Sequence, residues 1–598
     1  MIGALKVVAL FLALLGFAAT YGIYDLGVRR WPPEAVLPDG QRTALASDGI
    51  EACLKVRVMD LFGDPRAQHH WATCRNQLDR YQALGAFDLR FNGLAGSMAL
   101  GLLALFAFAL SVRFGTPALK VVRGPRLLSG RQAAAAFAKA SRRESARHGR
   151  GLTFLPGVPL SRDRESRHFL IWGSVGAGKT QTMLHLILAA IERGDGVLVL
   201  DTKGDMMAGL PANPAPLLVA PHDRRSLVWD VAADCRVKQD ARELAARFIP
   251  PSSDPMWSEA AQEVFVVCLS HLQASRRADW NWADLHHTVT ANVDTLTAMA
   301  REHHPSALRL LAQPESRTTQ SILSTFQTHM NTVSVLEEAW AASSAGRFSI
   351  RQWLHNPTPR RPLILQHDPG YPELSRIWIG SLLGVLASAV GSPSLSESRE
   401  RRIWLFLDEF PQLPPIRQFP SFLELGRSKG VIVVIGAQDF AQLRAAYGPE
   451  QAKSWAGMIG TKIITRINLS EAAEEASRLV GNQEIERRIK SRTDAQGRAS
   501  VTTSIHRESR RVITASEIAA CLGPVGRAVR VLFLGLGKDV YELEMPFVTL
   551  PRLRETTLPA DWTLKAVRAL SKDRGNTKLP SLPRLSKDMI EHIRQVRR

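Results

Sequence analysis

Eight consecutive residues have the composition of a phosphate-binding loop. They read Gly-Ser-Val-Gly-Ala-Gly-Lys-Thr and comprise Gly173, Ser174, Val175, Gly176, Ala177, Gly178, Lys179 and Thr180. Glycines let backbone N–H groups turn around the phosphates, the lysine reaches the β- and γ-phosphates, and the threonine hydroxyl is a ligand for Mg²⁺. The pattern therefore predicts a site for a nucleoside triphosphate and Mg²⁺.

A pair of adjacent carboxylates narrows the chemistry, because kinases, GTPases and transport ATPases all carry such a loop. The apolar run Ile403 to Leu407 ends in Asp408 and Glu409. Asp408 can hold the Mg²⁺ shell, and Glu409 can polarise the attacking water. The simpler alternative is two acids that open a loop before Pro411. Together with the loop, the pair favours ATP hydrolysis.

Gln438 is a third polar candidate. It follows the apolar run Val431 to Ile435 through Gly436 and Ala437. An amide at the tip of a core strand can sense the γ-phosphate and relay hydrolysis to a moving element, although an isolated glutamine at this position is more often a simple turn residue.

These groups need a scaffold whose strands end close together. From His168 onward, short runs rich in Val, Ile and Leu alternate with helical segments, which is typical of a parallel sheet covered by helices on both faces. The phosphate loop lies between one such strand and the helical run Gln181 to Arg193. We expect an α/β fold with strands at His168–Trp172, Gly196–Asp201, Pro362–Gln366, Ile403–Asp408, Val431–Gln438, Lys462–Ile467 and Arg530–Leu536.

Three segments do not follow this alternation. Residues 230–345 have helical periodicity and few strand patterns, which predicts an all-α domain inserted into the α/β core. Ser491 to Arg511 is polar and predicts a loop or an exposed hairpin, and the chain beyond Pro551 reads as a basic tail.

Two uncharged runs, Val7 to Tyr24 and Phe91 to Val112, are long enough to cross a bilayer. The first could instead be a cleaved signal peptide. Residues 25–90 carry nine basic and nine acidic residues, whereas residues 113–167 carry thirteen basic and three acidic residues. The positive-inside rule therefore predicts a multi-pass membrane protein with a small exported loop and most of the chain in the cytoplasm.

The net charge of +20 suggests nucleic acid or anionic lipid as a partner. The excess is uneven, however, because residues 230–345 carry nine basic and fourteen acidic residues. Membrane orientation, lipid contact and a basic tail explain most of it. Arg131 to Arg150 is a juxtamembrane helix or linker, either solvated or in contact with anionic lipid.

The five cysteines exclude a cysteine-rich secreted module. Cys53 and Cys74 both lie in the exported loop and could form a disulfide, and two unpaired thiols are the alternative. Cys235, Cys268 and Cys521 lack metal-ligand spacing, so we expect them to be buried apolar residues.

The motifs, taken in order, resemble the conjugative coupling proteins of type IV secretion systems, the TraD/TraG-like family. Besides the phosphate loop, they are Asp201-Thr202-Lys203-Gly204-Asp205-Met206, Met256-Trp257-Ser258-Glu259-Ala260-Ala261, Leu407-Asp408-Glu409-Phe410, Gly426-Arg427-Ser428-Lys429-Gly430 followed by Val431 to Gln438, Gln442-Leu443, and Arg511-Val512-Ile513 with Glu517-Ile518. The resemblance covers about residues 168–550. Thr202 departs from it, since a proline is common there.

The resemblance implies a RecA-like P-loop core in a homo-hexamer that is anchored in a bacterial inner membrane. ATP and Mg²⁺ would bind at subunit boundaries, where Arg427 would act as an arginine finger on the γ-phosphate of a neighbouring copy. An ordinary surface arginine is the alternative for Arg427. The implied partners are single-stranded DNA linked to a relaxase, other relaxosome proteins, components of the secretion channel, and membrane lipids.

We expect the chain to begin with a first transmembrane segment (1–24), a periplasmic loop domain (25–90), a second transmembrane segment (91–112) and a basic juxtamembrane linker (113–167). The nucleotide-binding core follows in two parts (168–229 and 346–554), which are separated by the all-α insert (230–345) and followed by a basic tail (555–598). The leading hypothesis is an ATPase that drives conjugative DNA transfer. The alternatives are an ATP-gated recruitment receptor and a septal chromosome translocase, although no winged DNA-reading domain is recognisable after Leu550.

Overall fold

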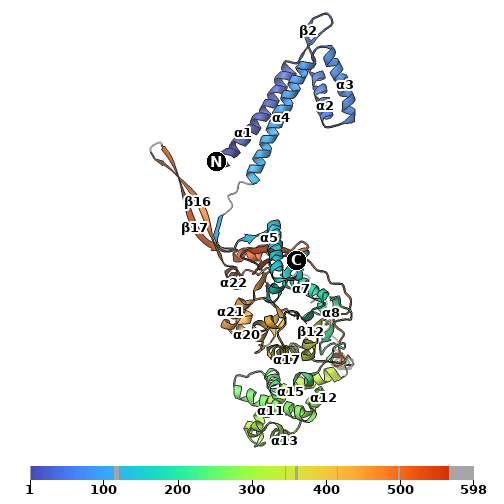
Figure 1. Ribbon diagram of the computed structural model, residues 1–598, viewed down its shortest axis with the longest axis vertical. Helices are drawn as coiled ribbons and strands as arrows, with labels where there is room; N and C mark the ends of the chain where they lie inside the picture. The colour runs from blue at the N-terminus through green and yellow to red at the C-terminus, as the bar shows by residue number, and fades with distance from the viewer. Residues whose placement is uncertain are drawn as a thin grey trace, which may run out of the picture. The chain divides into compact units, whose positions relative to one another are not determined.

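The structure is a computed structural model that describes residues 2–113, 120–341, 343, 345–356, 361–413, 415–495 and 498–564. The chain forms two compact units that divide after Lys120 (Figure 1). The predicted basic tail falls partly outside the described residues, because the description ends at residue 564.

The first unit is built on two long helices that lie side by side, α1 (Ile2–Tyr24) and α4 (Leu84–Arg113) (Figure 1). Small residues let them approach closely, since a Cβ added to Gly16 would lie 2.8 Å from the Cα of Gly101. The hydroxyls of Thr20 and Ser97 are 2.8 Å apart and share a hydrogen bond. Small residues and interhelical hydrogen bonds are the means by which helices associate in lipid.

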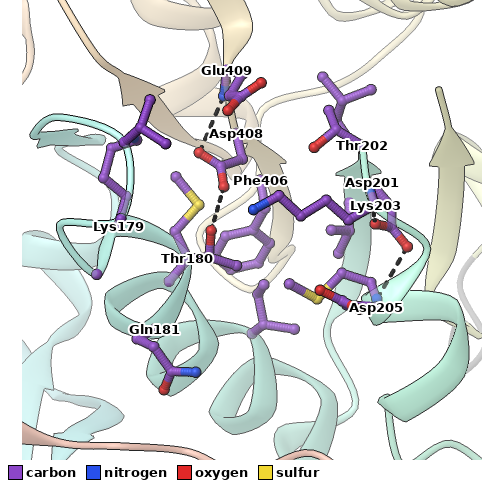
Figure 2. A pocket seen from close by; sticks show the side chains of 18 of the residues that line it. Lys179, Thr180, Gln181, Asp201, Thr202, Lys203, Asp205, Phe406, Asp408 and Glu409 are labelled. Carbon is purple, nitrogen blue, oxygen red and sulfur yellow. Dashed lines mark hydrogen bonds between the residues drawn. The ribbon is translucent and has the colours of Figure 1, made fainter. Parts of the chain in front are cut away.

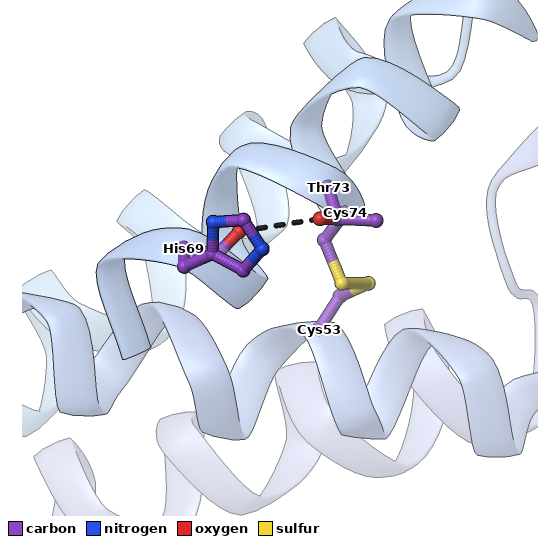
Figure 3. The surroundings of a disulfide bond; sticks show 4 residues. All are labelled: Cys53, His69, Thr73 and Cys74. Carbon is purple, nitrogen blue, oxygen red and sulfur yellow. Dashed lines mark hydrogen bonds between the residues drawn. A yellow bond between two sulfur atoms is a disulfide. The ribbon is translucent and has the colours of Figure 1, made fainter. Parts of the chain in front are cut away.

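A short hairpin of helices connects them, α2 (Ser47–Leu61) and α3 (Pro65–Arg80), preceded by the two-stranded β1 (Glu34–Val36) and β2 (Arg42–Ala44). Cys53 on α2 and Cys74 on α3 form a disulfide with a Cα–Cα distance of 5.9 Å (Figure 3). Of the two alternatives for these cysteines, the structure therefore has the bonded one. Trp71 and Phe87 pack in the small core beneath it, with ring centroids 5.6 Å apart.

Three helices among the described residues are long and apolar enough to cross a membrane: Leu10–Arg30, Leu84–Ala109 and Pro372–Gly391. Their burial separates them, because the first two are 17% and 11% buried whereas the third is 72% buried. The third is α17, whose apolar residues belong to the protein core. The two exposed helices coincide with the predicted spans, and α4 begins seven residues earlier than predicted, at Leu84.

The second unit contains an eleven-stranded sheet in the order β4-β20-β19-β15-β7-β14-β13-β8-β12-β9, with β18 paired to β19. Each predicted strand is present, within three residues of its expected ends: β7 (Phe169–Trp172), β8 (Gly196–Asp201), β12 (Leu363–Gln366), β13 (Ile403–Leu407), β14 (Val431–Ala437), β15 (Thr461–Ile464) and β19 (Ala528–Leu534).

The sheet is mixed, which corrects the prediction of a parallel one. The strands from β15 to β9 are parallel, but β19 pairs antiparallel with β15 and β20 (Val540–Pro546) pairs antiparallel with β19. The short connection between β19 and β20 explains the second of these pairings, because a hairpin can make it and a parallel crossover cannot. The strands at the two ends, β4 (Leu127–Leu128) and β9 (Leu217–Val219), are short, as is β18 (Gly523–Val525), which pairs with β19.

Both faces of this sheet are covered, as predicted. In β13, Leu405 and Leu407 belong to one buried apolar cluster, whereas Trp404 and Phe406 belong to the other. Helices α7 (Lys179–Arg193) and α5 (Gly130–His148) cover the Trp404 face, and α17 (Pro372–Gly391) covers the Leu405 face. This two-sided burial explains why the strands read as continuous apolar runs.

Among the described residues, 231–341 contain helices joined by loops and no strand, as predicted for the insert. The helices are α9 (Val231–Asp234), α10 (Lys238–Phe248), α11 (Pro255–Arg276), α12 (Trp282–Val289), α13 (Val293–His303), α14 (Leu308–Leu311) and α15 (Arg317–Ala341). Their buried residues belong to the same apolar cluster as one face of the sheet.

Two peripheral segments match one of their predicted alternatives. Arg131 to Arg150 is largely helix α5 rather than a solvated linker, because Phe137 is fully buried against Phe154, Phe533 and Tyr541. Residues 482–511 form a projecting hairpin, β16 (Asn482–Ala495) and β17 (Arg498–Arg511), longer than expected (Figure 1).

The chain after Pro551 also continues along the core up to residue 564, so no tail begins at residue 555. Leu558 N–H donates to Asp223, and the Trp562 indole donates to the carbonyl of Pro221. Cys235 and Cys268 are buried as expected, but Cys521 is exposed at the end of α23 (Ala515–Cys521).

Candidate nucleotide site

The phosphate loop connects β7 to α7 and is fixed at both ends. Gly173 N–H donates to the carbonyl of Ala437 at 3.1 Å, which ties the start of the loop to β14. Gly176 and Gly178 have φ angles of 70° and 91°, which glycine adopts without strain. A Cβ on Gly178 would also lie 2.6 Å from the side chain of Val529, so this position excludes other residues on two grounds.

Lys179 is the first residue of α7, and its side chain is buried. Its Nζ donates to the carbonyl oxygens of Gly173 at 3.0 Å and Ser174 at 3.3 Å, so the ammonium curls back over the loop. Burial lowers the pKa of Lys179, because desolvation disfavours the charged form, and the carboxylates of Asp408 and Glu409 oppose this effect.

Thr180 and Asp408 meet across the cavity (Figure 2). The hydroxyl of Thr180 donates to Oδ2 of Asp408 at 2.7 Å, although the two residues are 228 positions apart. Asp408 follows the last residue of β13, and Thr180 lies in the first turn of α7, so the sheet and the helix together bring the predicted Mg²⁺ ligands into contact.

Glu409 and Gln438 form a second pair. Nε2 of Gln438 donates to Oε1 of Glu409 at 3.0 Å, which joins the residues that follow β13 and β14. Glu409 has a φ angle of 54°, a left-handed conformation that is uncommon for a residue with a side chain. Such strain is tolerated where the surroundings fix the conformation, and it often occurs at functional sites.

Lys179, Thr180, Asp408 and Glu409 line a cavity of about 260 Å³, whose lining also includes residues without a predicted role. The ammonium of Lys203 points into it (Figure 2), which gives the site a second cation near Lys179. Phe547 and Pro524 line it from the C-terminal part of the chain, and Phe547 is 40% exposed. The motif at Asp201 to Met206 was a signal for Lys203, but no local pattern marks Phe547 or Pro524.

Asp201 shapes this edge of the site. Its carboxylate accepts hydrogen bonds from the backbone N–H groups of Lys203, Gly204, Met206 and Met207, at 2.8 to 3.1 Å. Burial raises its pKa, while these backbone hydrogen bonds favour the ionised form. Asp201 therefore holds the turn from which Lys203 projects.

Arg427 does not join this cavity. It lies on the short helix α19 (Gly426–Lys429), and its side chain is 58% exposed. Its guanidinium pairs with Asp163 at 2.8 Å, and the same carboxylate also pairs with Arg167 at 2.6 Å. The other predicted site residues lie together in one chain, whereas Arg427 faces outward.

The donor set suits a nucleotide with its metal. The Thr180 hydroxyl and the Asp408 carboxylate are hard oxygen ligands of the kind that Mg²⁺ prefers, and they are already in hydrogen-bond contact. Two ammonium groups and the N-terminus of α7 face the same space and suit an anionic phosphate chain.

Known proteins share this fold. Structures of the bacterial conjugative coupling protein TrwBdeltaN70 match with a TM-score of 0.61 at 24% identity, covering 74% of this chain and 98% of that one. Plasmid coupling protein TrwB in complex with ADP and Mg²⁺ matches with a TM-score of 0.60 at 23% identity, covering 75% and 100%. These likenesses confirm the RecA-like α/β core.

Sequence comparisons also find coupling proteins. Coupling protein TraD of Escherichia coli (strain K12) is 25% identical over 343 residues, which are 55% of this chain and 45% of that protein. The chain thus matches less than half the length of this relative. The model of the type IV secretion-system coupling protein DNA-binding domain matches residues 152–532, more than half of the chain. The chain therefore belongs to the family of type IV secretion-system coupling proteins.

Proposed function

We propose that this chain is an ATPase that drives conjugative transfer of DNA through a type IV secretion channel. The observation that carries the proposal is a cavity lined by Thr180, Asp408 and Glu409, in which Thr180 pairs with Asp408 and Gln438 donates to Glu409 from outside the lining. Family membership supports it, as do the relatives whose structures hold ADP with Mg²⁺ or nonhydrolysable ATP and GTP analogues.

Each residue then has a defined task. The backbone of residues 173–180 cradles the phosphates, and Lys179 leaves the loop carbonyls to bind the β- and γ-phosphates. Thr180 and Asp408 would hold Mg²⁺, which neutralises phosphate charge when bound. Glu409 accepts a proton from the attacking water, and Gln438 orients the Glu409 carboxylate, so loss of the γ-phosphate can be relayed to β14.

A direct test compares ATP turnover by the full chain in detergent, with and without single-stranded DNA. Lys179→Ala removes a buried cation, so we expect turnover to fall by about 100-fold or more. Lys453→Ala, at an exposed lysine, is the matched control and should behave as wild type. Wild-type protein without turnover, or Lys179→Ala with normal turnover, contradicts the proposal.

Glu409→Gln separates this motor from an ATP-gated recruitment receptor. The amide preserves size and can still share a hydrogen bond with Gln438, but it is no longer a base. A motor requires hydrolysis, so we expect DNA transfer in cells to disappear together with turnover. Transfer that persists while hydrolysis is abolished indicates gating instead.

Arg427 is proposed to act in trans, in a homo-hexamer. Its exposure and its distance from its own cavity suit a group that leaves Asp163 to reach the γ-phosphate of a neighbouring copy. Mixing Arg427→Ala with Lys179→Ala protein should restore part of the turnover that each variant lacks. Arg167→Ala, which frees the same carboxylate, is the control and should remain active. Failure of the mixture to recover activity excludes action in trans.

The proposed setting is a bacterial inner membrane. Helices α1 and α4 would span the bilayer with residues 25–90 exported, and the second unit would lie in the cytoplasm with residues 168–229 and 346–554 as the motor and 230–345 as an insert toward incoming DNA. The partners would be a relaxase-linked DNA strand with its relaxosome, the secretion channel and anionic lipid.

A further inference from the structure

The C-terminal end of α2 exposes large apolar side chains in an unusual concentration. Val58 is 44% exposed, Met59 53%, Leu61 62% and Phe62 87%, all within five consecutive residues. The neighbouring surface of α3 is polar, with exposed His69 and His70. A contiguous apolar patch is uncommon on a surface that faces water, and it usually marks a protein or membrane contact.

The charges in the same part of α2 are turned away from this patch. Arg57 pairs with Asp60 at 2.6 Å, and its guanidinium lies 4.7 Å from the ring centroid of Trp71 and 5.7 Å from that of Phe91. An ion pair covered by aromatic rings presents little net charge to its surroundings. The Arg57 and Asp60 side chains are already only 30% and 17% exposed, so placing the end of α2 in a medium of low dielectric desolvates little further charge.

This patch borders a groove of about 840 Å³ between α2 and the two candidate spans. Phe17 of α1 and Met98 and Leu102 of α4 form its far wall. Phe17 lies seven residues before the end of α1, roughly 10 Å along the helix axis. The groove thus continues the exposed apolar surface of both spans.

Helix α4 is longer than the thickness of the hydrocarbon core of a bilayer. Its 30 residues extend about 45 Å, whereas the hydrocarbon core of a bilayer is about 30 Å thick. Part of α4 therefore stands beyond the hydrocarbon, where the rest of the first unit packs against it. The end of α2 lies beside the α4 residues Met98 and Leu102, which belong to the candidate span.

We propose that this groove holds an acyl chain of a phospholipid from the surrounding bilayer, with the lipid phosphate beside Lys55. Lys55 and Glu51 are the charged residues that line the groove. The Glu51 carboxylate accepts hydrogen bonds from Tyr24 and Arg29, whereas Lys55 is exposed. The acyl chain continues along Val58 and Phe62 on one side and Met98 on the other. The last turn of α2 rests in the same leaflet and anchors the disulfide-bonded hairpin to the membrane surface.

Two features of the groove favour a phospholipid as its occupant: its continuity with the exposed faces of α1 and α4, and its charge. The groove opens from the faces of α1 and α4 that are exposed to lipid in the proposed setting, so bilayer lipid is the apolar molecule at highest local concentration. A cation above apolar walls matches a phosphate above an acyl chain. The inference rests on the proposed membrane insertion of α1 and α4, but not on ATP hydrolysis.

Photo-crosslinking of the full chain in phospholipid nanodiscs tests the proposal. Benzoylphenylalanine replaces Phe62 in one sample and His70, on the polar face of α3, in the matched control. Mass spectrometry should find lipid adducts at position 62 at least about 10-fold more abundant than at position 70, because only the former enters the leaflet. An adduct with a second copy of the chain, or equal lipid adducts at both positions, overturns the proposal.

A second measurement tests the phosphate contact. Protein extracted from membranes that contain phosphatidylglycerol is examined by native mass spectrometry for retained lipid. Lys55→Ala should lose several-fold more of this lipid than Arg66→Ala, which removes an exposed cation from α3. Equal retention by both variants overturns the assignment of Lys55. Lys179→Ala protein should give the wild-type result, so failure of the motor proposal leaves this one separately testable.

Discussion

Gly436 in β14 limits the space available to the carboxylate of Asp408. A Cβ at this position would overlap Oδ1 of Asp408, lie 2.7 Å from Cε of Met183 and lie 3.1 Å from the Cα of Asp408. The flexible end of Met183 can move aside, but Asp408 is held by the hydrogen bond from Thr180. Gly436→Ala therefore displaces the proposed Mg²⁺ ligand without removing any functional group.

The size of the effect follows from these distances. Carbon atoms rest at roughly 3.5 to 4.0 Å from their neighbours, so the Asp408 carboxylate must move by roughly 1 Å. A misplacement of about 1 Å can cost about 100-fold in rate, or about 2.7 kcal/mol of transition-state stabilisation. Overpacking alone would lower the free energy of unfolding by about 1 to 3 kcal/mol, and that loss does not depend on Mg²⁺.

Two assays on the full chain separate these effects. ATP turnover measured against Mg²⁺ concentration should fall by about 100-fold in Gly436→Ala, while nucleotide binding in the presence of a chelator changes little. Gly457→Ala introduces the same methyl group on α21 (Pro449–Met458), where nothing lies within 4 Å, and should match wild type. Turnover of Gly436→Ala within about threefold of Gly457→Ala would refute the reasoning, because Asp408 would then tolerate displacement.

Three further expectations concern other parts of the chain. Phe547→Ala should weaken ATP binding by about 10-fold, because the exposed ring can stack on the base, and should leave tripolyphosphate binding unchanged; calorimetry with both ligands decides. Burial lowers the pKa of His168 to about 4, so the unfolded chain binds more protons between pH 6.5 and 4 and stability falls as the pH falls. In urea unfolding, the free energy of unfolding should therefore fall by about 2 kcal/mol from pH 7 to pH 5. His168→Asn should abolish this fall, whereas His287→Asn, at an exposed histidine, should retain it. Replacing Cys53 and Cys74 by serine should cost the first unit about 3 kcal/mol, seen as faster hydrogen exchange in α2 and α3, and unchanged exchange would contradict this.

The strands of the core were predictable because each is a short, fully buried apolar run. Ile403 to Leu407 and Val431 to Ala437 carry the information for their own burial, and the loops after them carry the polar residues. Strand direction carries no such local signal. The antiparallel pairing of β19 with β15 depends on the connections between distant segments, which composition does not encode.

Helix α5 was difficult to interpret because two patterns overlap in it. Ala133, Phe137, Ser141 and Ser145 recur every four residues and form its buried face. Alanines and basic residues fill most of the remaining positions, so the segment reads as either a helix or a charged linker. The buried face is also weakly apolar, because two of its four residues are serines, one of which donates to the carbonyl of Pro159.

The candidate site likewise contains residues that the sequence predicted and residues that it did not. Thr180, Asp408, Glu409 and Gln438 were predictable because each follows a recognisable strand or loop and parallel strands end at one edge. Phe547 was not, because it reaches the cavity only through the packing of the segment after β20. That packing depends on Gln181, which exchanges two hydrogen bonds with the backbone of Val548, a contact between residues 367 positions apart.

The segment after β20 extends the influence of the nucleotide beyond its own cavity. Gln181 adjoins Thr180 and holds Val548, while Arg554 donates to the backbone carbonyls of Met207 and Leu210, in the segment that follows Asp201. The same segment thus contacts both the helix that begins at the phosphate loop and the turn that presents Lys203. A shift of either element on phosphate binding must either move this segment or break these hydrogen bonds. Residues 548–554 therefore connect two elements that border the cavity, although the sequence alone suggested that a tail begins beyond Pro551.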